Sequence, residues 1–275
     1  MNSNEKELSA IVRVEGGLAD EGLLDMYDAA NMIHGLARAL NIVAHSFANE
    51  QEIRSRANSA TGIQTLIHSS RKGCFEEQID VRFSAAVAAP LGPTVVVNNF
   101  WDYLAFSWSA AVGKAYEPRS SNLKKIVSTA DYFESEMADA LESAMFDVHK
   151  PILHDRKAKI FLERPRVGDV LQLNRHTLDF VTTREEKTRK FHLVGNVTRY
   201  NVLSDFGRLY SDEEKRVISF RLMNANEAEM RELIVNSMRK HVLGLPDKLR
   251  FVVSEVISST GQVKRYLVHS VAEIA

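Results

Sequence analysis

The chain has 275 residues, of which 45% are hydrophobic, and its formal net charge at pH 7 is −1. These totals predict one large globular domain or two smaller ones with a substantial core. The single cysteine, Cys74, excludes an intrachain disulfide and a cysteine-built metal site. Acidic side chains are in excess in residues 1–150 and basic ones in residues 151–275, which indicates either two units with different surfaces or chance drift in surface charge.

An apolar run, a diglycine and a helical pattern follow one another near the start of the chain. Ile11–Glu15 predicts a strand, Gly16-Gly17 a tight turn, and the apolar spacing from Gly22 to Phe47 a long helix. Asp20 is the expected N-cap of this helix. A loop before a helix suits a phosphate, but the Rossmann and P-loop glycine patterns are absent and the acidic neighbours would repel one.

The acidic residues of this junction allow two further hypotheses. Carboxylates between Glu15 and Asp28 could hold Mg²⁺ or Ca²⁺, or an enzyme could use an acidic site at the Glu15–Asp20 strand-helix junction. No EF-hand spacing is present, and the helix dipole alone favours acidic residues in a first turn. We therefore expect no metal site and no cofactor.

Two strands and an aromatic helix are expected next. Alternation over Ile63–Ile67 and Phe75–Phe83 predicts strands joined by a hairpin loop at Ser69–Gly73. The first part is therefore a β-α-β-β unit with one sheet face on the long helix. The run from Thr94 to Ala115 is apolar enough to raise the question of a membrane span.

The polar residues inside that run argue against a span. Asn98, Asn99 and Asp102 interrupt it, and an ionised aspartate at mid-membrane would cost several kcal/mol. We expect a buried or interface helix, with a membrane-contacting helix as the alternative, and no transmembrane segment. The polar N-terminus, with no apolar stretch after it, predicts no signal peptide.

A second long helix, capped by Ser121 or Asn122, is expected to extend to Val148. Its nearly heptad stripe fits an antiparallel helix pair that closes the first domain, with a dimerising coiled coil as the alternative. Lys150-Pro151 would end the helix and divide the chain into a domain of residues 1–150 and a domain of residues 151–275.

The second domain is expected to be a small barrel. Leu171 and Phe180 lie in short β-type runs. The elements that follow are a strand at Lys190–Leu203 with a bulge or bend at Gly195, strands at Arg208–Tyr210 and Val217–Leu222, a helix capped by Asn226, and a hairpin of Leu249–Ser258 and Gln262–Val268. This β-β-β-α-β-β order is that of an OB-type barrel, so the predicted fold class is α+β.

Two sets of residues could contact partners. The first three barrel strands carry aromatic and cationic residues that could bind nucleic acid: Arg199, Tyr200, Arg208, Tyr210, Phe220 and Arg221. Alternatively, the aromatics among them belong to the core and the arginines are ordinary solvated charges. A protein-interaction surface could include Trp101, Phe106 and Trp108, if they are not buried, together with His34 and Arg38.

His34 and Arg38 belong to a polar helix stripe with Asn31, Asn41 and His45, which is either a binding surface or a solvated face. The nine histidines do not cluster as metal ligands, and the common serine-, cysteine- and zinc-hydrolase motifs are absent. Their absence argues against an enzyme without excluding one.

Several motifs resemble a family of bacterial proteins of unknown function. They are Val14–Glu21 with Leu24, Tyr27-Asp28, Gly35–Arg38, Lys72-Gly73, His149–Ile152, and Gly195–Val197 with Gly207–Tyr210. The resemblance covers most of the chain. It implies a bacterial or phage-related cytoplasmic protein and carries no activity or site residues.

The function expected from these patterns is that of a non-catalytic binding or accessory protein that acts through protein–protein contacts or self-association. A nucleic-acid-binding protein that uses the barrel is the first alternative. An enzyme with the acidic junction site is the second.

Overall fold

The computed structural model describes residues 6–54, 59–68, 75–89, 93–130, 133–184, 188–202, 205–223, 228–245, 248–258 and 263–274. The hairpin loop at residues 69–73, Cys74 and the expected cap Asn226 lie outside them. The contacts divide the chain into two compact units, Met1–Val181 (unit 1) and Thr182–Ala275 (unit 2).

Unit 1 is built on an antiparallel five-stranded sheet in the order β2-β3-β1-β4-β5. The strands are β1 (Lys6–Glu15), β2 (Ile63–Ile67), β3 (Phe75–Phe83), β4 (Lys159–Arg164) and β5 (Gly168–Leu173). β1 alternates as the sequence predicts, because every second side chain from Leu8 to Val14 is buried. The sequence placed a domain boundary at residue 150, whereas β4 pairs with β1 and so joins the sheet of unit 1.

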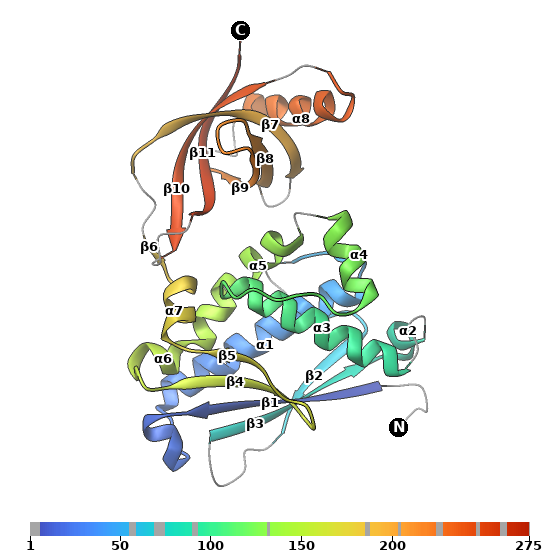
Figure 1. Cartoon of the computed structure of the whole chain (residues 1–275), viewed down its shortest axis with the longest axis vertical. Helices are drawn as coiled ribbons and strands as arrows, with labels where there is room; N and C mark the ends of the chain where they lie inside the picture. Colours follow the sequence, from blue (N-terminus) through green and yellow to red (C-terminus); the bar gives the residue numbers. More distant parts are fainter. Residues whose placement is uncertain are drawn as a thin grey trace. The chain divides into compact units, whose positions relative to one another are not determined.

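Helices cover one face of this sheet (Figure 1). The three long ones are α1 (Met26–Ala48), α3 (Pro93–Ala111) and α5 (Phe133–Val148). Shorter elements are the 3₁₀ turn η1 (Gly17–Glu21), α2 (Ala85–Ala88), α4 (Ser121–Thr129), α6 (Lys150–His154) and α7 (Arg175–Val181). α3 and α5 form the expected pair of long helices, packed through Phe133 against Tyr103 and Phe106.

Three expectations about the helices of unit 1 are wrong in detail. Asp25, not Asp20, caps α1, because η1 intervenes and Asp25 accepts from the N–H groups of Tyr27 and Asp28. The second long helix is divided into α4 and α5, and its cap is Ser120. Phe180 lies on α7 rather than in a β-type run.

Unit 2 is a closed five-stranded barrel with the order β7-β8-β9-β11-β10-β7. Its strands are β7 (Phe191–Asn201), β8 (Phe206–Ser211), β9 (Arg216–Leu222), β10 (Leu249–Ser258) and β11 (Val263–Glu273), with the short β6 (Thr183–Arg184) paired to β10. In chain order, the helix α8 (Ala228–Val242) follows the third barrel strand, β9, and precedes the fourth, β10. The predicted α+β fold class, with OB-like strand order, is confirmed.

Gly195 lets β7 approach its neighbour closely. A Cβ at this position would collide with the backbone carbonyl of Tyr210 on β8. The register shift in the same strand lies further on, between Val197 and Arg199. Gly195 is therefore a point of close approach between the two strands. The predicted bulge occurs further along β7, between Val197 and Arg199.

No helix in the part of the chain that the structure describes is both long enough and apolar enough to cross a membrane. The aromatic run that raised the question forms α3, whose side chains Phe100, Trp101, Tyr103, Leu104, Phe106 and Trp108 belong to the core of unit 1. Their burial against α1, α5 and the sheet accounts for the hydrophobicity of this segment.

Candidate functional site

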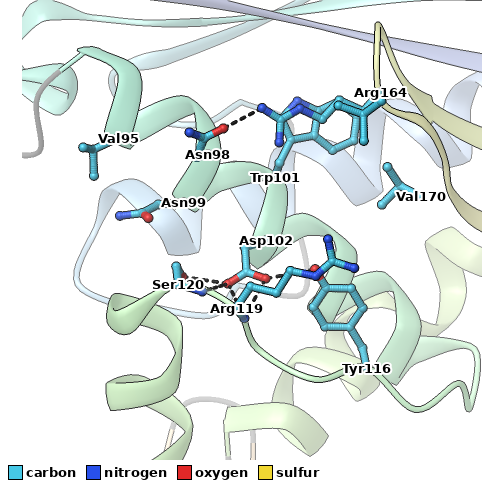
Figure 2. Close-up of a pocket in the computed structure, with 11 residues that line it drawn as sticks. Val95, Asn98, Asn99, Trp101, Asp102, Tyr116, Arg119, Ser120, Arg164 and Val170 are labelled. Atoms are coloured by element: carbon cyan, nitrogen blue, oxygen red, sulfur yellow. Dashed lines mark hydrogen bonds between the residues drawn. The ribbon is translucent and has the colours of Figure 1, made fainter.

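A pocket with a volume of about 420 Å³ lies in unit 1 between α3, the loop before α4 and the β4–β5 hairpin (Figure 2). This volume falls in the range of small-molecule sites. The lining residues are Val95, Asn98, Asn99, Trp101 and Asp102 of α3, Tyr116, Arg119 and Ser120 of the loop, and Arg164, Val167 and Val170 of the hairpin.

Asp102 holds the loop against α3. One of its oxygens accepts from the Tyr116 hydroxyl (2.9 Å), and the other accepts from the Ser120 hydroxyl (2.7 Å) and the Ser120 backbone N–H (2.8 Å). The Arg119 backbone N–H adds a further bond at 3.1 Å. Ser120 in turn caps α4, since its hydroxyl accepts from the Leu123 N–H. Asp102 is only 6% exposed, and these hydrogen bonds satisfy its buried carboxylate.

The same contacts keep Tyr116 protonated. Partial burial raises the pKa of Tyr116 to about 12, and the hydrogen bond to Asp102 acts in the same direction. A hydroxyl that donates to a carboxylate is a poor proton donor for a ligand or substrate. Asp102 and Tyr116 therefore form a fixed wall of the pocket rather than an acid–base pair.

Two guanidinium groups face the pocket. Arg164 donates from Nη2 to the carboxamide oxygen of Asn98 (2.5 Å), and its Cζ lies 5.8 Å from the centroid of the Trp101 ring. The Cζ of Arg119 lies 5.9 Å from the centroid of the Tyr116 ring. Figure 2 shows the two side chains reaching into the site from different elements. Among the described residues, neither guanidinium forms an ion pair with a carboxylate.

The arrangement suits an anion that carries an apolar body. Arginine forks match the oxygen geometry of carboxylates and phosphates. Exposed Asn98 and the half-buried Asn99 add carboxamide groups, while Val95, Val167 and Val170 supply apolar contacts. The residues that line the pocket include no histidine or cysteine, and the one carboxylate is fully engaged. Binding, not proton transfer, is the chemistry that these groups support.

A family model for a domain of unknown function, DUF7946, matches residues 10–182. The chain belongs to this family. The DUF7946 domain thus coincides with unit 1 and contains every residue of the pocket. The resemblance to a family of unknown function is confirmed. No curated protein and no solved structure matches the chain significantly.

The residues expected to form a protein-interaction surface on the DUF7946 domain lie apart. Trp101, Phe106 and Trp108 were expected to contribute to this surface only if they were exposed, and they are buried. Arg38 pairs with Asp147 (3.0 Å) on α5, and exposed His34 lies 3.8 Å from the same carboxylate. Of the polar stripe on α1, Asn41 and His45 are buried, so the stripe is not a continuous solvated face.

The acidic strand-helix junction of the DUF7946 domain is a structural corner. Glu15 pairs with Arg13, and Asp20 accepts from the Gly16 N–H (2.7 Å). A Cβ at Gly17, whose φ is +59°, would collide with the Asp155 side chain. The described residues contain no group of three or more His, Cys, Asp or Glu side chains that could hold a metal ion.

The barrel residues expected to bind nucleic acid, which lie outside the DUF7946 domain, divide into three groups. Tyr200 and Phe220 face the barrel interior, stacked with ring centroids 6.5 Å apart. Arg208 is 5% exposed. Tyr210 and Arg221 are exposed on β8 and β9, and Arg199 is intermediate. The six residues therefore do not form one continuous surface.

The pocket itself was not predicted from the sequence. Its one visible signal was the interruption of the apolar helix by Asn98, Asn99 and Asp102. This interruption was interpreted only as evidence against a membrane span. Arg119 and Arg164 gave no local signal, because they reach the pocket from separate loops and hairpins.

Proposed function

We propose that this chain is a non-catalytic binding protein whose DUF7946 domain holds a small anionic ligand. The observation that carries the proposal is the pair of guanidinium groups, Arg119 and Arg164, which face one pocket without a carboxylate partner among the described residues. A ligand with carboxylate or phosphate oxygens would supply the missing charge.

Other arginines of unit 1 give a contrast. Arg13, Arg38, Arg82 and Arg175 each pair with a carboxylate. Arg156 and Arg166 form no ion pair among the described residues either, but neither lines the pocket. Two arginines that line one pocket and instead contact an amide and aromatic rings are therefore candidates for ligand binding.

The wider role proposed is that of an accessory protein in a bacterial or phage-related cytoplasm, in which ligand binding accompanies protein–protein contacts. The sequence resemblance supports that setting, and the absence of the common hydrolase motifs supports a non-catalytic role. The engaged carboxylate of Asp102 further supports a non-catalytic role, because a general base needs a free lone pair.

Calorimetric titration with inorganic phosphate, pyrophosphate and citrate tests the proposal. The wild-type chain should bind at least one of these anions, and Arg164→Gln and Arg119→Gln should each weaken binding about tenfold or more, since a charged hydrogen bond contributes about 1.5–3 kcal/mol. Arg166→Gln is the matched control, because Arg166 is exposed in the same β4–β5 turn but does not line the pocket. Absence of binding by the wild type to all three anions would refute the proposal.

Nucleic-acid binding by the barrel is a second candidate. The observation that favours it is a closed barrel of OB-like order with Tyr210 and Arg221 exposed on its second and third strands. Tyr210→Ala and Arg221→Ala should each weaken salt-sensitive binding of a labelled single-stranded oligonucleotide, whereas Arg250→Ala on β10 should not. Unchanged oligonucleotide mobility with the wild type at low salt would remove this candidate.

A further inference from the structure

The corner between β1 and α1 exposes four large apolar side chains. In the segment Gly17–Tyr27, which we call the acidic corner, the exposed fractions are 58% for Leu18, 56% for Leu23, 86% for Met26 and 69% for Tyr27. Isolated apolar residues on a surface are ordinary, but four exposed within one short segment are a candidate for a single interaction patch. Patches of this kind, rimmed by polar groups, mark interaction sites.

The local structure holds this patch in place. The Leu23 N–H donates to the Leu18 carbonyl (3.1 Å), which keeps these two residues together at the end of η1. Asp25 caps α1 and so fixes the backbone of Met26 and Tyr27 in the first helical turn. The apolar side chains are therefore displayed by ordered backbone, which lowers the entropic cost of binding a partner.

The acidic corner itself carries charge of one sign, with Lys157 as the neighbouring cation on the loop that packs against Gly16. Asp20, Glu21 and Asp25 are exposed, and no lysine or arginine occurs between residues 17 and 27. The complementary surface would be apolar and basic, because opposite charges around an apolar contact steer association and fix its register.

The end of α8 in unit 2 has that composition. In the segment Arg239–Leu245, which we call the basic end, Val242, Leu243 and Leu245 are 78%, 60% and 52% exposed. Arg239 and His241 are exposed too, and the segment contains no acidic residue, while Lys240 pairs with Glu273 of β11 (3.5 Å). α8 ends at Val242, and Gly244 in the following turn has a φ of +66°. The Leu245 N–H donates to the Lys240 carbonyl (3.0 Å), so the segment has a defined conformation.

We propose that the acidic corner of one molecule binds the basic end of α8 of a second copy of this chain. The apolar side chains of the two segments supply the buried contact, and the opposite charges around them supply its orientation. This inference is independent of the pocket and its ligand. The two surfaces differ. Two copies that exchange the contact reciprocally therefore form a closed two-fold dimer, whereas copies that pass it head to tail form a ring.

Light scattering coupled to size-exclusion chromatography tests the contact over a range of protein concentrations. Wild-type mass should rise above that of one chain as concentration rises. Met26→Ser with Tyr27→Ser, and separately Val242→Ser with Leu243→Ser, should each weaken self-association about tenfold or more. Val202→Ser, which removes another exposed apolar side chain (58%), is the matched control and should leave the mass unchanged.

Mixing the two double variants gives the decisive measurement. Each keeps the surface that the other lacks, so the mixture should form heterodimers through one intact contact. A wild type that stays monomeric at all concentrations would overturn the proposal, and so would a Val242→Ser/Leu243→Ser variant that associates like the wild type. Recovery of association by Glu21→Lys mixed with Arg239→Glu, each weaker alone, would support it without altering any apolar residue.

Discussion

Lowering the pH should destabilise unit 1 through one buried histidine. His149 is 0% exposed, where α5 meets α6, and its Nδ1 donates to the Met145 carbonyl (2.6 Å) while its Nε2 lies 2.9 Å from the Thr177 hydroxyl. Because a carbonyl can only accept, Nδ1 carries the proton in the neutral ring. Burial lowers the pKa of His149 to about 4, against an ordinary value of 6.5.

The sign and size follow from this shift. Since the folded chain resists protonation more than the unfolded chain, stability is fully present above pH 6.5 and is lost as the pH falls toward 4. The full loss is about 3 kcal/mol, and about 2 kcal/mol of it falls between pH 7 and pH 5. Carboxylates titrate in the same range, so a variant comparison must isolate the histidine.

Urea unfolding of wild type, His149→Gln and His176→Gln at pH 7 and pH 5 makes that comparison. Both tryptophans, Trp101 and Trp108, belong to unit 1, so tryptophan fluorescence follows the unfolding of this unit. His149→Gln should lose about 2 kcal/mol less than the wild type between the two pH values. The exposed His176 serves as control and its variant should behave like the wild type. Equal losses in all three proteins would refute the reasoning.

Three further predictions concern the stability of unit 1 and use the same unfolding assay. Gly35→Ala should cost about 1–3 kcal/mol despite better helix propensity, because the new Cβ would lie 2.6 Å from the Ala144 carbonyl oxygen; a stabilised variant would contradict the close packing of α1 on α5. Asp25→Ala should cost about 1 kcal/mol and Asp20→Ala less, and the reverse order would reinstate Asp20 as the cap. Asp102→Asn should cost about 1–3 kcal/mol, since its amide would face N–H donors; an unchanged midpoint would show that the loop is held otherwise.

Individual strands and helices were the most predictable part of the fold. Period-two alternation marked β3 between Phe75 and Phe83. The hairpin of β10 and β11 was also predicted, although β11 extends to Glu273 rather than to Val268. Such signals are local, and each was strong enough to stand without tertiary information. The barrel order then followed from the sequence of strands and one helix.

Other features depended on distant parts of the chain. Asp20 and Asp25 are equally good caps by composition, and the choice is decided by the 3₁₀ turn η1, which contains Asp20 and ends before Asp25. The β4–β5 hairpin joins unit 1 because of its pairing with β1, which no local pattern reveals. The pocket has the same character, since Arg164 and Asn98 are 66 positions apart.

The way in which β11 closes the barrel also bears on how unit 2 is assembled. β11 pairs with β10 on one side and in parallel with β9 on the other. Until Val263–Glu273 has been synthesised and docked, β9 and β10 both present open edges, and exposed edges recruit strands from other molecules. The last-made strand of the barrel thus protects two edges at once, so a polypeptide that loses it would be prone to aggregate even if every earlier strand folded correctly.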